Sequence, residues 1–182
     1  METVKTHEAS TTLLEAAESG ELKPWTEALT DILVGIFPKM GWRGAARGHR
    51  SNLLPVPRSE YLALDIVAFK IAGDRRWRFP VGVFELENSP VEDLAAYSLW
   101  KVLCVRASLR VVICYRRDAI EGAELVTHLA DQVVQATEIP TRTGLGGETL
   151  VIVGSRSETA SFPYGFFKDW TLDANTARFR RN

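Results

Sequence analysis

Three acidic side chains interrupt two apolar segments of the sequence. Asp65 lies within YLALDIVAF, and Glu85 and Glu87 lie within VGVFELENS. Burying an unpaired carboxylate is costly, so three of them in apolar surroundings require a compensating cation. Magnesium binds one or two carboxylates together with water and substrate phosphate. The pattern therefore predicts a site for Mg²⁺ or Mn²⁺ at Asp65, Glu85 and Glu87, and with it phosphodiester chemistry.

Two predicted strands bring these acids within reach of one another. Residues 61–69 and 80–87 are typical of buried strands, with Asp65 at the middle of the first. Side chains alternate on a strand, so Glu85 and Glu87 point to the same side, roughly 6.6 to 6.8 Å apart along the chain. If the two strands are neighbours, Asp65 lies roughly 5 Å from one glutamate. All three carboxylates then share one face.

A purely structural interpretation of the acids remains open. Asp65 could bind a backbone amide at a bulge. Glu85 and Glu87 could face solvent from an edge strand and pair with Arg76 or Arg78, since polar and apolar residues partly alternate there.

A single lysine follows the acids on a predicted helix, residues 91–105. Tyr97 and Lys101 are four residues apart and share a face, with Leu94 a further turn back. An ammonium group beside the acids could orient a water molecule and stabilise charge that develops at phosphorus. The alternative is that Lys101 pairs with Glu87 or extends to solvent.

The elements that must position these residues alternate along the chain. Apolar periodicity predicts helices at residues 25–37, 91–105 and 119–137, and strands at 61–69, 80–87, 110–115 and 149–153. The run 110–115 is continuously apolar, which suits a strand covered on both faces. This order predicts an α/β fold, an α/β/α sandwich with a central mixed β-sheet.

The acids resemble the motif of a known superfamily. Glu27 on an early helix, Asp65 in a strand and the Glu85-Leu86-Glu87 triplet before a helix are similar to the PD-(D/E)XK nucleases over residues 25–115. The resemblance implies a restriction-endonuclease-like fold. It also implies that Asp65 and Glu85 bind magnesium, and that Glu27 is the helical acid that assists them.

The sequence departs from that motif at two positions. Leu64 precedes Asp65 where the motif has proline, and Glu87 stands where it has lysine. Some members carry the lysine on the following helix, and Lys101 suits that migrated position. If Lys101 does not take this role, the resemblance implies a site that binds metal and cuts poorly.

Contacts with nucleic acid must come from local patches, because the net charge is −1 and the sequence pI is near 6.3. Arg43, Arg47 and Arg50 form a basic, glycine-bearing segment that could follow a phosphate backbone, and Tyr97 could contact a base. The alternatives are solvated surface for the arginines and a core position for Tyr97 and Trp100.

The domain organisation is expected to be simple. Residues 1–22 form a polar lead-in, 23–172 a single nuclease-like domain, and 173–182 a basic C-terminal tail.

Cys104 and Cys114 lie in apolar runs without metal-ligand spacing and are expected to be reduced. No signal peptide or membrane-spanning run is recognisable, so a cytoplasmic location without membrane contact is expected.

Three functions follow as hypotheses. The first is a magnesium-dependent endonuclease that hydrolyses phosphodiester bonds of DNA, or of RNA, through a metal-activated water. The second is a catalytically degenerate nuclease-fold module that binds nucleic acid or a protein partner. The third is a subunit of a homodimer or larger assembly, with Trp42, Trp77 and Trp170 contributing to an interface.

Overall fold

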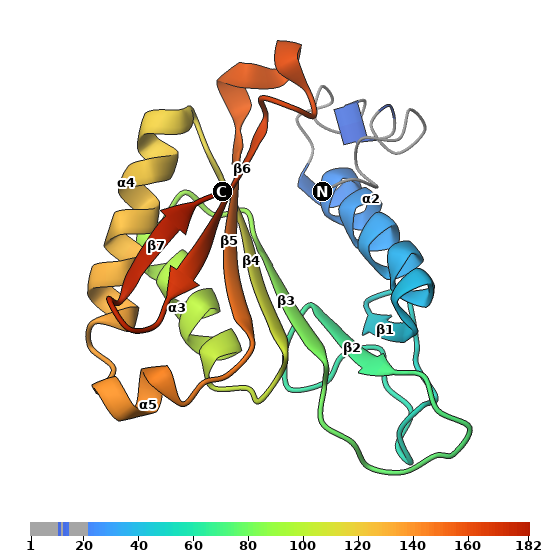
Figure 1. The fold of residues 1–182 in the computed structure, drawn as a ribbon. Helices are drawn as coiled ribbons and strands as arrows, with labels where there is room; N and C mark the ends of the chain where they lie inside the picture. Colours follow the sequence, from blue (N-terminus) through green and yellow to red (C-terminus); the bar gives the residue numbers. More distant parts are fainter. Residues whose placement is uncertain (1–10, 12, 15–21) are drawn as a thin grey trace.

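The described part of the chain folds around one mixed sheet of seven strands (Figure 1). The structure is a computed structural model and describes residues 11, 13, 14 and 22–182, so most of the predicted lead-in lies outside the described residues. The spatial order of the strands follows the chain: β1 (Trp42–Ala46), β2 (Ile66–Lys70), β3 (Gly82–Glu87), β4 (Leu109–Arg116), β5 (Glu148–Ser155), β6 (Phe167–Asp173) and β7 (Arg178–Arg181). The predicted α/β fold is confirmed.

The centre of the sheet is parallel and its two sides are antiparallel. β3, β4 and β5 run parallel, whereas β2 with β1 on one side, and β6 with β7 on the other, pair antiparallel. The helices are α2 (Leu22–Ile36), α3 (Glu92–Leu103), α4 (Ala119–Leu129) and α5 (Ile139–Thr143); a π-helical turn, Ala130–Val134, continues α4. α3 and α4 connect the parallel strands and lie on one face, while α2 covers the other (Figure 1).

The core is divided by the sheet into two layers. On β4, Val112 and Cys114 pack on the side of α3 and α4, and Val111, Ile113 and Tyr115 pack on the side of α2. All five side chains are buried, as expected for a strand covered on both faces. The same alternation on β3 decides which residues can reach helix α3.

The strand predicted at residues 61–69 begins later than expected, at Ile66. The preceding residues form a turn in which the Leu64 N–H donates to the Tyr61 carbonyl at 3.1 Å, and Leu62 and Ala63 have φ values of 59° and 53°. Two consecutive non-glycine residues in the left-handed region are rare. The apolar sequence is typical of a strand and therefore gave no indication of this turn. Asp65 therefore stands at the entrance to β2 and not at the middle of a strand.

Most of the segment predicted as a basic C-terminal tail, residues 173–182, belongs to the sheet. β7 pairs with β6 in antiparallel register, with Trp170 opposite Arg181. Ala177 in the connecting turn is 2% exposed, and Phe179 packs against the core beside α4. Alternating arginines around one phenylalanine are the pattern of an edge strand with one solvated face, which a basic tail resembles in composition.

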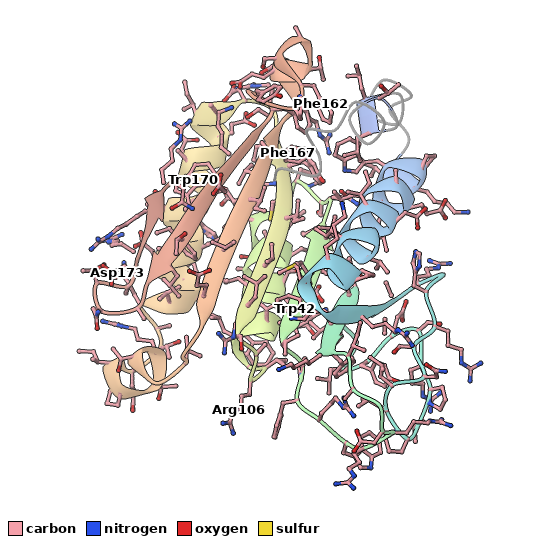
Figure 2. All side chains as sticks on the ribbon, turned by 45° about the vertical axis from the view of Figure 1, so that its right-hand side comes forward. Trp42, Arg106, Phe162, Phe167, Trp170 and Asp173 are labelled. Atoms are coloured by element: carbon pink, nitrogen blue, oxygen red, sulfur yellow. The ribbon has the colours of Figure 1, made fainter. Side chains whose placement is uncertain are left out.

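The tryptophans proposed for an interface differ in exposure. Figure 2 labels Trp170 on β6 and Trp42 on β1. Trp170 is 6% exposed and Trp42 is partly buried, whereas Trp77 is 67% exposed. Trp170 is thus a core residue, and the expectation that it feeds an interface is wrong. Among the described helices, none has the length and apolar character needed to cross a membrane.

Candidate active site

The site lies where strands β2 and β3 separate. The antiparallel register pairs Ile66 with Phe84. Extending it by one residue sets Asp65 opposite Glu85, on the same face of the sheet. Pairing stops here because the turn before β2 leads the chain away. Asp65 Oδ2 instead accepts a hydrogen bond from the Leu86 N–H at 2.8 Å, so its side chain replaces the missing backbone acceptor.

Glu85 carries its carboxylate into the interface between β3 and α3. The residue is 4% exposed, and its Oε2 lies 2.9 Å from Lys101 Nζ and 3.4 Å from the Ser98 hydroxyl that donates to it. Ser98 and Lys101 are three positions apart on α3 and so share one face of the helix. Glu85 Oε1 is buried and has no hydrogen-bond partner in the part of the chain that the structure describes. Such an orphaned acceptor is costly, and a bound cation would satisfy it.

Lys101 links three elements. Besides Glu85, its ammonium group donates to the Ala63 carbonyl at 2.8 Å, in the turn that precedes Asp65. Its side chain is 20% exposed, against 6% for that of Glu85. The structure thus brings Lys101 to Glu85, while its catalytic role stays a prediction.

The electrostatics of the site are dominated by burial. Burial raises the pKa of Glu85 above its ordinary value, the hydrogen bond from Lys101 opposes this, and the nearby Asp65 charge raises the pKa further. The Lys101 ammonium is therefore the chief group that favours the ionised form of Glu85. Any loss of Lys101 would shift Glu85 further toward protonation.

Glu87 lies apart from this group. It is on the same face of β3 as Glu85, but its Oε1 accepts a hydrogen bond from the Ser89 N–H at 2.7 Å, where the strand ends. Among the described residues, no three His, Cys, Asp or Glu side chains are grouped so that they could hold a metal ion. The centre of three carboxylates expected from the sequence is therefore not formed; the arrangement is two carboxylates and one ammonium. Strand alternation correctly predicts the face of β3 on which Glu87 lies. Its carboxylate, however, binds the backbone N–H of Ser89 and not the other acids.

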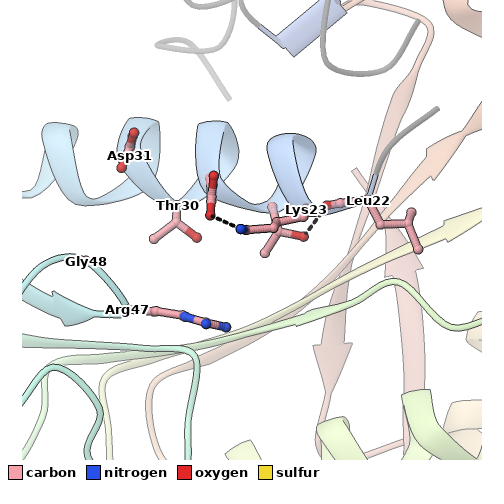
Figure 3. Close-up of a pocket in the computed structure, with 8 residues that line it drawn as sticks. Leu22, Lys23, Thr30, Asp31, Arg47 and Gly48 are labelled. Atoms are coloured by element: carbon pink, nitrogen blue, oxygen red, sulfur yellow. Dashed lines mark hydrogen bonds and ion pairs between the residues drawn. The ribbon is translucent and has the colours of Figure 1, made fainter. Parts of the chain in front are cut away.

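Glu27 is not brought to the site either. It is exposed on α2 and pairs with Lys23 at 3.9 Å. α2 packs on the sheet face that carries Phe84, whereas Glu85 is on the opposite face. Glu27 instead lines a groove of about 680 Å³ beside Arg47, which lies on the segment that follows β1 (Figure 3). The resemblance assigned Glu27 to the site only because it lies on an early helix. That assignment is wrong, because the helix packs on the face of the sheet opposite to Glu85.

The predicted basic contacts also lie away from the acids. Arg43, Arg47 and Arg50 are exposed on β1 and the segment after it, and Arg43 Nη1 donates to Asn52 Oδ1 at 3.3 Å. None of the three forms a hydrogen bond or ion pair with Asp65 or Glu85 in the described structure. Their binding to nucleic acid stays a prediction.

Tyr97 and Trp100 are exposed and not core residues. Each is 55% exposed, and their rings stack at a centroid distance of 6.0 Å with 22° between the planes. Lys101 Nζ lies 5.5 Å from the centroid of the Tyr97 ring. Sequence reasoning placed Trp100 on the packed side of α3. The helical spacing could have corrected the prediction for Trp100. Trp100 lies one turn from Tyr97 and next to Lys101, away from the buried face of α3 that carries Leu99.

Comparisons with known proteins add a fold likeness. No protein-family model and no curated protein matches the sequence. Among solved structures, the cAAA-bound form of NucC from E. coli MS115-1 is similar, with a TM-score of 0.48 and 10% sequence identity over 96% of this chain and 78% of that one. This likeness concerns the path of the chain. The proposal below is based on the side chains of the site.

Proposed function

We propose that the protein is a metal-dependent nuclease that hydrolyses phosphodiester bonds of nucleic acid. The observation that carries the proposal is the buried Glu85 Oε1 beside Asp65, which has no hydrogen-bond partner among the described residues, with Lys101 2.9 Å from the other Glu85 oxygen. The donor set fits a hard divalent cation, since both residues offer carboxylate oxygens. Mg²⁺ or Mn²⁺ held by Asp65 and Glu85 would supply Lewis-acid stabilisation of phosphate and an activated water.

The side chains of the site have separable tasks. The Leu86 N–H fixes the orientation of Asp65, and Ser98 and Lys101 fix one oxygen of Glu85, which leaves the other oxygen available as a ligand. Lys101 is the cation that can approach a non-bridging phosphate oxygen. Charge that accumulates on this oxygen during the displacement would be stabilised by a preorganised donor, typically by about 100- to 1,000-fold in rate per donor.

Cleavage of a DNA and RNA panel with Mg²⁺, Mn²⁺ or EDTA tests the proposal. We expect metal-dependent cleavage, reduced about 100-fold or more in Asp65→Asn and in Lys101→Met. Glu148→Gln is a matched control, because Glu148 is an exposed acid at the start of β5. Folded Asp65→Asn protein that cleaves as fast as the unchanged chain would exclude this assignment.

A second candidate is a nuclease-fold module that binds nucleic acid without cutting it. Two observations favour it: Glu87 stands at the motif position of lysine, and Lys101 already neutralises Glu85. Such a module would bind oligonucleotides equally well in EDTA and would release no product with either metal. Any turnover that is lost in Asp65→Asn rules it out.

A further inference from the structure

The outward side of helix α3 carries an aromatic surface that its packing does not use. The helix buries Ala95, Ser98, Leu99 and Val102 against the sheet and α4. Tyr97 and Trp100 lie off that stripe, each 55% exposed and stacked on one another, and we call them the aromatic platform. Adjacent exposed aromatic rings of this kind mark a candidate interaction site.

The aromatic platform is continuous with the candidate active site through one side chain. Lys101 Nζ lies 5.5 Å from the Tyr97 ring centroid and 2.9 Å from Glu85 Oε2. Tyr97 and Lys101 are one helical turn apart, about 6 Å along the axis. A nucleotide whose phosphate contacts Lys101 therefore has its base, or that of its neighbour, within reach of the platform.

A groove extends from the aromatic platform and could receive the edge of a base. It has a volume of about 400 Å³ and runs between α3 and the helical segment that follows α4. Asp93 and Gln132 line it together with Val133. A carboxylate and an amide offer acceptors and donors for a base edge, whereas the valine contributes apolar contact.

The charge around the platform favours an unpaired base over a duplex. Duplex binding depends on neutralising many phosphates with Lys and Arg. Here Glu92 and Asp93 occupy the first turn of α3, and the chain has a net charge of −1. Stacking requires a free base face, which a duplex covers and a single strand exposes.

We infer that Tyr97 and Trp100 stack an unpaired nucleobase that flanks the phosphodiester bound at Lys101, so that the substrate is single-stranded or locally unpaired nucleic acid. This inference rests on the proposed function, of which it names the substrate class. The stacked base would position the adjacent phosphate over Asp65 and Glu85, and binding would depend on base faces more than on phosphate charge.

Binding measured in EDTA tests the stacking without any cleavage. A fluorescently labelled single strand of about 12 nucleotides and its duplex are titrated with the full chain by anisotropy. Trp100→Ala and Tyr97→Ala are expected to weaken single-strand binding about 5- to 150-fold, the effect of losing one stacked base. Trp100→Phe keeps a ring and should retain binding. Trp77→Ala is the matched control, since Trp77 is 67% exposed in the loop at the other end of β2 and β3.

A scan of single abasic sites identifies the stacked base itself. For the unchanged chain, removing the base that stacks should weaken binding as much as Trp100→Ala weakens binding of the intact strand. For Trp100→Ala, removing the same base should have no further effect. Equal affinity for single strand and duplex with no effect of Trp100→Ala overturns the inference, as does the absence of any oligonucleotide binding. A dimer that Trp100→Ala converts to a monomer, with oligonucleotide affinity unchanged, also overturns it, because a second copy would then cover the platform.

The same panel separates this inference from the proposed function. Cleavage that depends on Asp65 but not on Trp100 or Tyr97 contradicts the stacking alone. Trp100-dependent binding of single strands without cleavage under any metal contradicts the nuclease proposal alone.

Discussion

Lys101 and Glu85 form a largely buried ion pair across the interface of α3 and β3, with 2.9 Å between Nζ and Oε2. The same ammonium group donates to the Ala63 carbonyl, so it also fixes the turn before Asp65. Buried pairs add little net stability, yet removing one partner leaves an uncompensated charge and costs about 3 to 5 kcal/mol. The ion pair therefore orients Glu85 and the turn before Asp65. Replacing either partner alone should change the stability differently from replacing both.

Lys101→Met should destabilise the fold by about 3 kcal/mol near neutral pH, because Glu85 loses its counter-charge. Combining it with Glu85→Gln should restore much of that loss. Urea unfolding of the two single variants and the double variant measures the coupling. Lys70→Met, at an exposed position of β2, serves as the control. Strictly additive losses would show that the ion pair is not coupled.

Stability should depend on pH through Glu85. Its folded pKa is raised, chiefly by burial, so the native state holds a proton that the unfolded state releases above about pH 4.5. The contribution of Glu85 is therefore full below that pH and is lost as the pH rises through the folded value. The free energy of unfolding of the unchanged chain minus that of Glu85→Gln should fall as the pH rises above about 4.5, through the raised folded pKa of Glu85. Denaturant titrations at several pH values test this, and an increasing difference would contradict it.

Metal binding should raise the melting temperature through the two carboxylates. A ligand present at about 100 times its Kd stabilises the native state by about 2.7 kcal/mol. We expect Mg²⁺ or Mn²⁺ to raise Tm in the unchanged chain and in Glu148→Gln, and not in Asp65→Asn or Glu85→Gln. The effect should weaken toward acidic pH, since the raised pKa of Glu85 lets protons compete with the metal. An equal shift in Asp65→Asn would place the ion elsewhere.

A lysine at position 87 should partly replace Lys101. Both residues 85 and 87 lie on the face of β3 that α3 covers, roughly 6.6 to 6.8 Å apart. In the Lys101→Met background, Glu87→Lys should therefore regain about 10-fold in cleavage rate, since a general cation near the phosphate is restored. Glu87→Gln in the same background removes the charge without supplying an ammonium group, and it should not recover activity. Equal rates for the two double variants would refute a role for the ammonium group.

Ala63→Gly should stabilise the protein by up to about 1 kcal/mol. Ala63 has φ of 53°, where an alanine costs about 1 to 2 kcal/mol, and glycine offsets part of this gain through its greater freedom in the unfolded chain. The carbonyl that accepts from Lys101 is retained. Ala63→Val, which is β-branched, should destabilise instead. Thermal unfolding compares the three, and a lower Tm for Ala63→Gly would contradict the strain argument.

Local pattern was sufficient for the central elements. Apolar runs and helical spacing predict β3, β4 and α3 close to their observed bounds, because each buries a continuous stripe or face. The helix predicted at residues 119–137 is observed as α4, which ends at Leu129, followed by a π-helical turn that ends at Val134. The pattern was misleading at residues 61–64, where two left-handed residues interrupt an apolar run, and at β7, where arginines surround one partly buried phenylalanine, Phe179. In both places packing against another element contributes, since Lys101 of α3 binds the Ala63 carbonyl and Phe179 packs against the core.

The sequence by itself determined the α/β class, the candidate acids and the lysine that could join them, since residue type and strand alternation are local properties. Only the tertiary structure decided which acids meet. Register sets Asp65 opposite Glu85, a single hydrogen bond turns Glu87 away, and the packing of α2 on the opposite face removes Glu27. The physical reason is that the register between strands, and the face of the sheet on which a helix packs, depend on how whole elements pack together. The energy of that packing is spread over contacts between residues far apart in the chain.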